Sequence, residues 1–506
     1  MSDQAGGVAR PRYSAAYKGL VLAMLLAGYT FNFIDRTIIA TIGQAIKVDL
    51  KITDSQLGLL GGLYFALLYT LLGVPIARLA ERWNRVSIIS LALVIWSGFT
   101  ALCGTATSFA QLALYRFGVG FGEAGCSPPS HSLISDYYPP RQRASALSVY
   151  AFGIPLGTMF GAVAGGWIAE HLSWRAAFVI VGLPGVILAL LIKLLVREPP
   201  RGHAEAEARA ALADDVAPEP LPVPRASLWG ELKEMGAVVA ALFGKWPVLN
   251  MVLGVTIASF GSYGSGQFVP PYFVRNFGLG LAAVGAIVGL AGGASTGIGT
   301  LLGGFLTDAL GKRRPAWYAL VPAFGLLIAT PIYIAIYLQK TWQGAALLLL
   351  IPGVFHYTYL APTFAVVQNS VEPRRRATAT AILFLFLNLI ALGGGPPFTG
   401  FIIDRLAQFH VTHAGPKTVA EWLGGLLHPA AGAGANAPAF SAACPGGTAP
   451  TAAGAAANAA CHTALVQATR EGIIVSLCFY AWASLHYFLA ALGLAKHMHA
   501  RAAAQA

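Results

Sequence analysis

Two nine-residue stretches of this chain repeat each other, ARLAERWNR at residues 77–85 and GFLTDALGK at residues 304–312. In both, a small residue is followed four positions later by an acid and eight positions later by a base, with a turn-forming residue just before the base. A second pair, PRQRA at 140–144 and PRRRA at 373–377, repeats with an offset of 233 residues against 227 for the first. The chain is therefore predicted to contain two parallel halves built on one plan.

The composition indicates that these halves lie in a membrane. Of 506 residues 56% are apolar and only 11% are charged, which is too little polar surface to cover a water-soluble globule of this length. A helix needs about 20 mainly apolar residues to cross the hydrocarbon, and such runs recur twelve times. They lie near residues 18–44, 54–78, 86–106, 109–135, 143–169, 173–196, 246–275, 282–307, 315–338, 342–370, 376–403 and 470–495.

The length of these runs excludes a membrane barrel, whose strands alternate in polarity over about ten residues. We therefore predict an all-α membrane protein with twelve transmembrane helices in two parallel six-helix halves. The predicted parts are an N-terminal tail at 1–17, an N-terminal half at 18–196, a linker at 197–245, a C-terminal half at 246–495 and a C-terminal tail at 496–506. The linker is rich in charges and proline, which indicates a solvated connection.

The basic residues set the predicted orientation. With both termini in the cytoplasm, 23 of the 33 basic residues fall on the cytoplasmic side and 8 on the other, while Arg36 and Arg116 lie within helices. This is the positive-inside bias of membrane proteins, and it accounts for the net charge of +12 without a nucleic-acid partner. We expect an integral protein of a bacterial inner membrane with both termini cytoplasmic.

The C-terminal half contains a second long connection, residues 404–469, which is rich in Ala, Gly and Pro and is predicted outside the cytoplasm. Cys444 and Cys461 lie in it, the only cysteines outside predicted helices. On an oxidising face they could form a disulfide, and two free thiols are the alternative, because sequence does not settle connectivity.

Short motifs connect the chain to a known family. The two nine-residue stretches resemble the G-x-x-x-D-(R/K)-x-G-(R/K) element that major facilitators carry after helices two and eight. RFGVGFGEA at 116–124 and GIPLG at 153–157 are similar to the family's motifs in helices four and five. Together with NFIDR at 32–36, they look like the spinster-like branch, although an Asn-x-x-Asp-Arg in helix one also occurs in organic-anion symporters. That branch moves amphiphilic lipids such as sphingosine 1-phosphate and lysophospholipids, so the resemblance implies a lipid transporter.

Four charged residues are predicted well inside helices of the N-terminal half, and ionised groups at that depth cost a few kcal/mol each unless they pair, face a cavity or serve a function. We predict that Asp35 and Glu123 are proton-coupling residues. Arg36 and Arg116 are predicted to bind a substrate anion, because a guanidinium stays charged and binds carboxylate or phosphate through two hydrogen bonds. The alternative is a permanent ion-pair lattice that only fixes helix packing.

The C-terminal half offers polar and aromatic side chains at membrane depth instead of charges. A cavity with one charged and one polar-aromatic wall suits an amphiphile, although aromatic side chains in membrane helices more often pack or lie at the interface. The predicted substrate-binding residues of this half are Tyr263, Gln267, His356, Tyr357 and Asn388.

The charged residues of the repeated stretches are predicted to gate the transporter. Glu81 and Arg85 of the first stretch correspond to Asp308 and Lys312 of the second. An acid here can cap a neighbouring helix or pair with an arginine, and breaking that contact would permit the halves to rock. A solvated loop acid is the alternative.

These features favour a monomeric secondary transporter, coupled to protons, that carries an amphiphilic organic anion or lysolipid across the bilayer. A proton symporter for small soluble organic acids is the nearest rival, and a membrane sensor without transport is a further one. No phosphate-binding loop, H-E-x-x-H or C-x-x-C occurs in the sequence. We therefore expect no enzyme activity, no metal site and no cofactor apart from the coupling proton.

Overall fold

The computed structural model of the chain describes residues 13–204, 207, 228–371, 376–412, 418–427 and 439–503. All elements within these ranges are helices, which confirms the predicted all-α class. Most of the predicted N-terminal tail, residues 205–206 and 208–227 of the linker, parts of the 404–469 connection and the last three residues lie outside the described part of the chain.

The N-terminal half forms six membrane-crossing runs, several of which are broken into two helices. Its helices are α1 (Ala15–Thr41), α2 (Gly43–Leu50), α3 (Asp54–Gly61), α4 (Leu63–Arg82), α5 (Arg85–Cys103), α6 (Phe109–Glu123), α7 (Ser127–Tyr137), α8 (Pro140–Ala151), α9 (Gly153–His171) and α10 (Trp174–Leu195). The breaks and starts have local causes. Pro128 and Pro129 follow the break between α6 and α7, and the Asn84 side chain caps α5 by accepting from the backbone N–H of Ser87.

The C-terminal half repeats this plan after the helix α12 (Leu228–Phe243). Its runs are α13 (Trp246–Phe277); α14 (Leu281–Ala286) with α15 (Gly293–Gly311); α16 (Trp317–Tyr337); α17 (Trp342–Leu349), α18 (Pro352–His356) and α19 (Leu360–Asn369); α20 (Arg376–Leu385) with α21 (Gly393–Thr412); and α24 (Gly454–Ala503). Two π-helical turns, Ile287–Gly292 and Phe386–Leu392, join α14 to α15 and α20 to α21. The short helices α22 (Val419–Leu427) and α23 (Phe440–Ala443) belong to the long connection before α24.

Eleven of these runs are by themselves long and apolar enough to cross a membrane. The run from α6 to α7 supplies the twelfth crossing, and it carries Arg116 and Glu123. The described part of the chain thus fits the predicted twelve-helix architecture.

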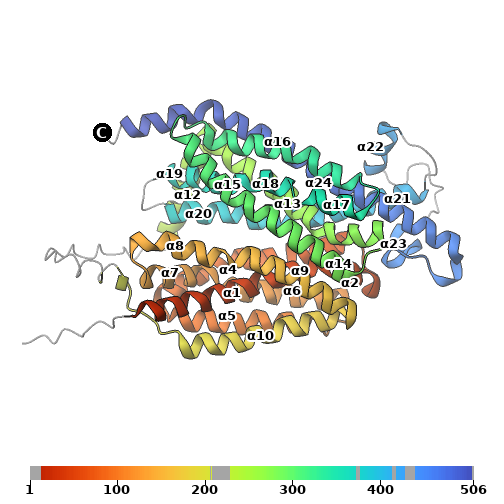
Figure 1. Ribbon diagram of the computed structural model, residues 1–506, viewed down its shortest axis with the longest axis horizontal. Helices are drawn as coiled ribbons and strands as arrows, with labels where there is room; N and C mark the ends of the chain where they lie inside the picture. Colours follow the sequence, from red (N-terminus) through yellow and green to blue (C-terminus); the bar gives the residue numbers. More distant parts are fainter. Residues whose placement is uncertain are drawn as a thin grey trace, which may run out of the picture.

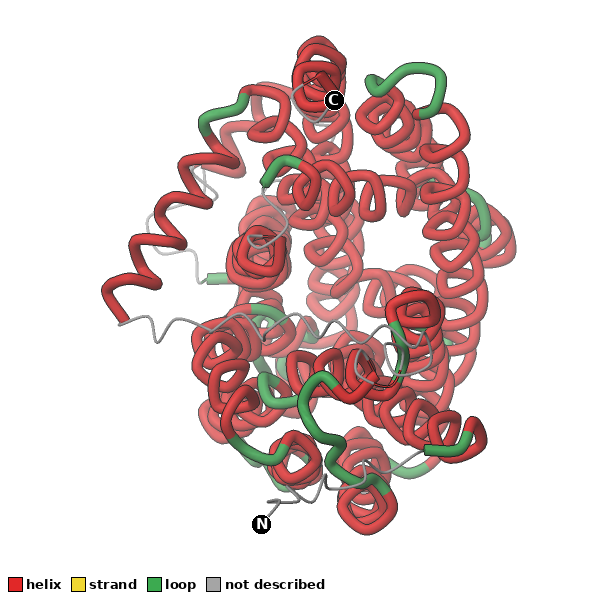
Figure 2. Tube along the Cα trace, turned by 90° about the vertical axis from the view of Figure 1, so that its left-hand side faces the viewer, coloured by secondary structure: helices red, strands yellow, loops and turns green. Residues whose placement is uncertain are grey.

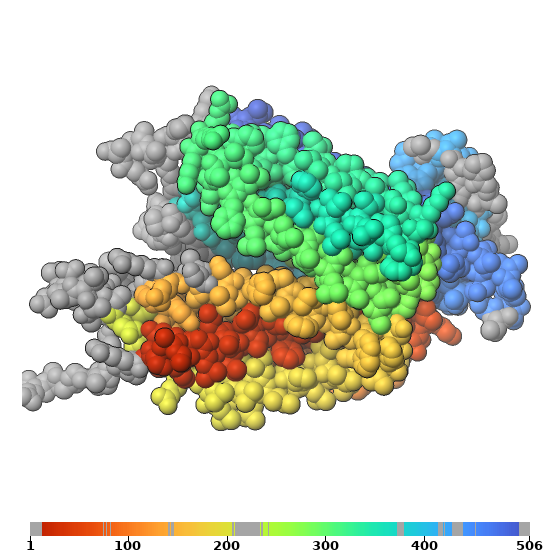
Figure 3. Space-filling view, viewed as in Figure 1, coloured from red at the N-terminus to blue at the C-terminus, as the bar shows by residue number. Residues whose placement is uncertain are grey.

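The two halves lie side by side with their helices running in the same general direction (Figure 1). Viewed along the helices, the molecule is a bundle (Figure 2), and the surfaces of the halves meet along one seam (Figure 3). We call the end where α1 begins and α24 ends the terminal face. The opposite end, which carries α22 and α23, is the loop face.

The halves approach each other most closely through two helix pairs, α9 with α14 and α3 with α21. The connection before α24 adds a third contact at the loop face. A disulfide joins Cys444 to Cys461 on α24, and the turn that follows Cys444 lies against α2 of the other half. Gly446 in this turn has φ of 69°, and a Cβ there would lie 3.2 Å from the Lys47 carbonyl oxygen, so both the backbone conformation and the space favour glycine.

We expect the disulfide to form in the purified protein. Alkylation of the denatured chain without reductant should modify three cysteines, because Cys103, Cys126 and Cys478 are the free ones. After reduction all five should react. Intact-mass spectrometry measures this directly, and a Cys444→Ala/Cys461→Ala variant, which should give three with or without reductant, is the control. Five modified cysteines in the unreduced wild-type chain would contradict the bond.

Candidate functional site

The centre of the N-terminal half holds a buried ion pair between α1 and α6. The Nε of Arg36 donates to Oε2 of Glu123 at 2.8 Å, and the two side chains are 17% and 0% exposed. The guanidinium carbon lies 5.1, 4.8 and 4.6 Å from the ring centres of Phe33, Phe65 and Tyr69. Such cation–π contacts strengthen when water is excluded, so Arg36 is held both by a carboxylate and by aromatic faces.

Arg116 lies on the same helix as Glu123 but has a different partner. Its Nε donates to the carbonyl oxygen of Leu60 at 3.2 Å, close to the break between α3 and α4, and its guanidinium also packs near Phe65, at 5.3 Å. The side chain is 1% exposed. The seven-residue spacing that places Arg116 and Glu123 on one helix face therefore does not make them an ion pair in this structure.

Several buried polar atoms around this pair have no hydrogen-bond partner among the described residues. They are Oδ1 of Asp35, Oε1 of Glu123 and both amide atoms of Asn32. Asp35 and Arg36 come from α1 and Arg116 and Glu123 from α6, and the side chains of all four are at most 17% exposed. Buried polar groups are almost always hydrogen bonded, so these atoms are exceptions within the described part of the chain.

The C-terminal half contributes a cage of aromatic rings around His356. The imidazole centre is 4.4 Å from the Tyr480 ring and 4.6 Å from the Tyr357 ring, and Nδ1 lies 3.4 Å from the Tyr333 hydroxyl. His356 is 1% exposed, and its Nε2 has no partner among the described residues. Sequence reasoning missed Tyr333 and Tyr480. They lie on α16 and α24, and the sequence of each of these helices indicates only an apolar run.

The other predicted residues of this half have different surroundings. Tyr263 on α13 is exposed. Gln267 is buried against Gly61 of α3, at the contact between the halves. Asn388 donates to the Phe384 carbonyl of its own helix at 2.9 Å. The structure therefore places Gln267 and Asn388 in helix contacts and leaves Tyr263 exposed.

The predicted gating residues are not equivalent in the structure. Arg85 is fully buried and binds within its own half, with Nε 2.6 Å from Glu198 and an Nη 2.5 Å from Asp136. Asp308 is exposed and accepts from the Tyr318 hydroxyl at 3.2 Å, while Lys312 is exposed. The backbone of Glu81 lies in the last turn of α4, and its side chain lies outside the described part of the chain. Sequence reasoning missed Asp136, which lies in the last turn of α7, and Glu198, which follows α10.

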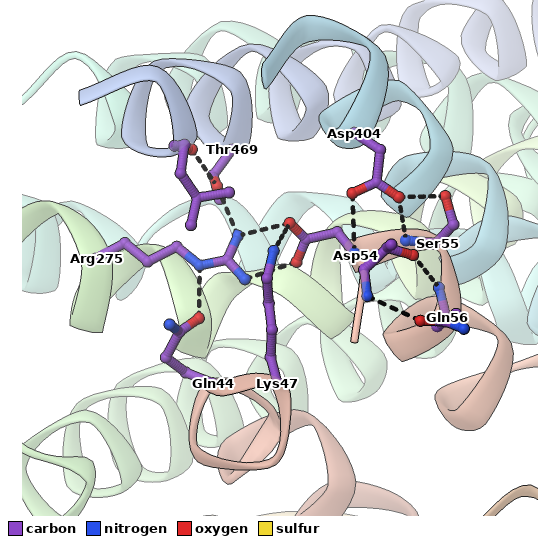
Figure 4. Close-up of polar contacts among 10 residues, drawn as sticks. Gln44, Lys47, Asp54, Ser55, Gln56, Arg275, Asp404 and Thr469 are labelled. Atoms are coloured by element: carbon purple, nitrogen blue, oxygen red, sulfur yellow. Dashed lines mark hydrogen bonds and ion pairs between the residues drawn. The ribbon is translucent and has the colours of Figure 1, made fainter. Parts of the chain in front are cut away.

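A second buried charged cluster joins the halves at the loop face (Figure 4). Asp54 of α3 accepts a hydrogen bond from Nη2 of Arg275 at 2.6 Å and also forms an ion pair with the ammonium of Lys47. All three side chains are at most 2% exposed. Arg275 completes its bonds with Gln44 at 2.6 Å and Thr469 at 2.7 Å. We call Gln44, Lys47, Asp54, Arg275 and Thr469 the loop-face cluster.

The loop-face cluster was not predicted. Asp54 and Arg275 are the first and last residues of predicted apolar runs, where charged side chains normally lie in water. Their burial depends on the opposite half covering them. The sequence does contain one indication, because Asp54 and Arg275 are charged residues at helix ends that the repeated plan of the two halves brings to the same face. This pattern does not identify which residues they bind.

The comparisons with known proteins agree with this architecture. The model of the Major Facilitator Superfamily matches residues 25–396 and 251–492. An inward-facing, unoccupied crystal structure of a bacterial homologue of the human lysosomal transporter Spinster is 34% identical, covering 96% of this chain and 99% of that one, with a TM-score of 0.79. An MFS-type efflux pump of Mycolicibacterium smegmatis is 31% identical over 75% of this chain and 83% of its own length. A hexuronate transporter of Bacillus subtilis is 27% identical over 77% and 89%.

A helical membrane protein with two repeated halves around a charged centre is a membrane transporter, and this chain belongs to the Major Facilitator Superfamily. Within that superfamily it resembles the spinster-like branch, as the motifs of helices one, four and five indicated.

The loop-face cluster predicts an unequal response to removal of two acids. Asp54→Ala leaves Lys47 and Arg275 buried without their shared carboxylate, which should destabilise the protein by about 3–5 kcal/mol. Asp49→Ala, the control, breaks a half-exposed pair with Arg175 inside one half and should cost about 0–1 kcal/mol. Thermal unfolding in detergent compares the two, and equal melting temperatures would show that the cluster adds nothing to stability.

Proposed function

We propose that this transporter moves an amphiphilic organic anion or lysolipid across a bacterial inner membrane, driven by protons, through alternating access as a monomer. The observation that carries the proposal is the buried Arg36–Glu123 pair with its unsatisfied neighbours. An anionic head group fits the guanidinium groups of Arg36 and Arg116. The aromatic rings around Arg36 and the exposed Tyr263 ring provide apolar surface for a chain.

The same pair suggests how a proton is coupled to the substrate. While Arg36 holds Glu123, the carboxylate is neutralised by the guanidinium. If a substrate anion draws Arg36 away, Glu123 remains in a buried site, where a lone negative charge is disfavoured and a proton restores neutrality. Asp35, whose Oδ1 has no hydrogen-bond partner among the described residues, is positioned to share that proton. Substrate and proton would then bind together and leave together.

The loop-face cluster supports an assignment of sides and of state. It closes the seam at the loop face, and the related Spinster homologue is described as inward-facing. We therefore place the terminal face in the cytoplasm, in agreement with the excess of basic residues on that side. In this assignment the substrate site is closed toward the outside.

The second candidate is a proton symporter for small soluble organic acids. The 27% identity to a hexuronate transporter favours it, and an arginine clamp binds a carboxylate as well as a phosphate. The two candidates differ in the role of the aromatic and exposed apolar surface, which only an amphiphile would use.

Proton coupling predicts a specific change in Glu123→Gln. In proteoliposomes one coupled proton supplies about 1.4 kcal/mol per pH unit, or about tenfold accumulation. We expect wild-type counterflow to respond to an imposed pH gradient, and Glu123→Gln to bind substrate but lose that response, because the amide cannot release a proton. Asp49→Asn, which alters a pair away from the cluster, should keep the response. Unchanged pH dependence in Glu123→Gln would rule out the coupling role.

Ligand stabilisation separates the two candidate substrates. At a concentration of 100 times Kd a bound ligand stabilises the folded state by about 2.7 kcal/mol. We expect sphingosine 1-phosphate or lysophosphatidylglycerol to raise the melting temperature of the detergent-solubilised protein, and glucuronate to leave it unchanged. Arg36→Gln should abolish the rise. A response to glucuronate alone would favour the organic-acid symporter.

A further inference from the structure

Two acids at the loop face each cap a helix of the opposite half. They are Asp404 in the middle of α21 and Glu170 near the end of α9, and neither belongs to the sites described above. The first four N–H groups of a helix have no partner within that helix. A carboxylate placed there is stabilised by hydrogen bonds and by the positive end of the helix dipole.

Asp404 completes the cap of α3. The side chain of Thr53 already accepts from the backbone N–H of Gln56, as part of a capping box, which leaves the N–H groups of Asp54 and Ser55 open. Oδ1 of Asp404 accepts from Asp54 N at 2.9 Å, and Oδ2 accepts from Ser55 N at 2.8 Å and from the Ser55 hydroxyl (Figure 4). The open backbone N–H groups in the first turn of α3, a helix of the N-terminal half, therefore donate to a side chain of the C-terminal half.

Glu170 does the same for the helix run that begins at Leu281. The N-cap of that run is Gly280, which has no side chain to cap it. Oε2 of Glu170 accepts from the backbone N–H of Ala282 at 2.7 Å. A Cβ on Gly280 would lie 2.3 Å from the same oxygen, so the glycine gives the carboxylate its access. Here the capping side chain belongs to the N-terminal half.

A glycine four residues before each acid brings the helices together. A Cβ on Gly400 would lie 2.1 Å from the Asp54 carbonyl oxygen, and a Cβ on Gly166 would lie 2.3 Å from the Leu281 carbonyl oxygen. Real Cβ atoms do not approach so closely, so any larger residue would push the halves apart. The element is thus a glycine followed four positions later by an acid, on one helix, against the first turn of a helix in the other half.

The two elements are copies of each other in the internal repeat. Gly400 and Asp404 each follow Gly166 and Glu170 by 234 residues, and Ala282 follows Ser55 by 227. These offsets agree with the 227 and 233 of the cytoplasmic-side motifs. The structure therefore contains a symmetric contact that the repeat explains and that chance packing does not.

We infer that Gly400–Asp404 and Gly166–Glu170 are paired latches that hold the loop face closed, and that their release permits the loop face to open. The inference rests on the alternating access of the proposed function, but not on its substrate or on proton coupling. Both latches are made of charge-assisted hydrogen bonds to backbone N–H groups of a first helical turn, and water can replace each partner after separation. The Asp54–Arg275 ion pair also joins the two halves, so it separates together with the latches when the loop face opens.

The two latches are unequal. Asp404 is partly buried, makes three hydrogen bonds and adjoins the loop-face cluster, whereas Glu170 is exposed and makes one. Removal of the Asp404 charge should therefore affect closure more than removal of the Glu170 charge.

The test measures the opening of the loop face directly. Spin labels on Thr105→Cys and Lys340→Cys, exposed positions in loops of opposite halves, report the distance between the halves in the full chain with Cys478→Ser. We expect Asp404→Asn to raise the population with the longer distance about tenfold, because it weakens several charge-assisted hydrogen bonds. Glu170→Gln should raise it about threefold, because it weakens only one. Asp404→Glu should restore part of the closed population.

Matched variants separate a latch from general damage. Asp49→Asn removes an acid of the same face whose partner lies in its own half, and it should leave the distance distribution unchanged. Gly400→Ala should open the face, while Gly297→Ala, which adds a Cβ into open space, should not.

Distributions for Asp404→Asn and Glu170→Gln that match Asp49→Asn would overturn the latch. If Asp404→Asn does not fold, the exposed Glu170→Gln still decides the question. A wild-type protein whose loop face never opens, with substrate or at any pH, would instead refute alternating access, so the two failures are distinguishable.

Discussion

A charge buried at membrane depth has little water to bind, so most buried charges in the described part of this protein have a partner on another helix. This constraint accounts for both polar centres. The Arg36–Glu123 pair joins α1 to α6, and Asp54 is shared by Lys47 and Arg275 at the loop face. Since unpaired buried charges are strongly destabilising, each pair favours an arrangement of helices that keeps its two partners together.

The two centres differ in how completely they are satisfied. At the loop face Arg275 bonds to Asp54, Gln44 and Thr469. In the central cluster, atoms of Asp35, Glu123 and Asn32 lack partners among the described residues. A satisfied network stabilises one arrangement, whereas an unsatisfied one leaves binding capacity for a proton or an anion. The contrast agrees with a closure contact at one end of the molecule and a substrate site at its centre.

The internal repeat predicts some contacts of the two halves correctly and others not. The nine-residue stretches are alike in sequence, yet Arg85 is buried in a network with Asp136 and Glu198, while Asp308 contacts only the Tyr318 hydroxyl among the partners described. Conversely, Asp404 and Glu170 form equivalent contacts, although no shared motif of several residues predicts them. Similar sequence thus led to different contacts where the halves have different neighbours, and similar contacts arose where the seam is symmetric.

The sequence by itself determined the helical class, the twelve crossings, the two-halved plan and the four charged residues of the centre. These depend on local hydrophobicity and on residue spacing, which need no knowledge of the distant chain. Only the tertiary structure decided that Glu123 pairs with Arg36 and not with Arg116, that Tyr333 and Tyr480 surround His356, and that Asp54 and Arg275 are buried at all. Partners and burial are set by segments up to several hundred residues away, because it is the opposite helix, and not the local sequence, that removes a side chain from water.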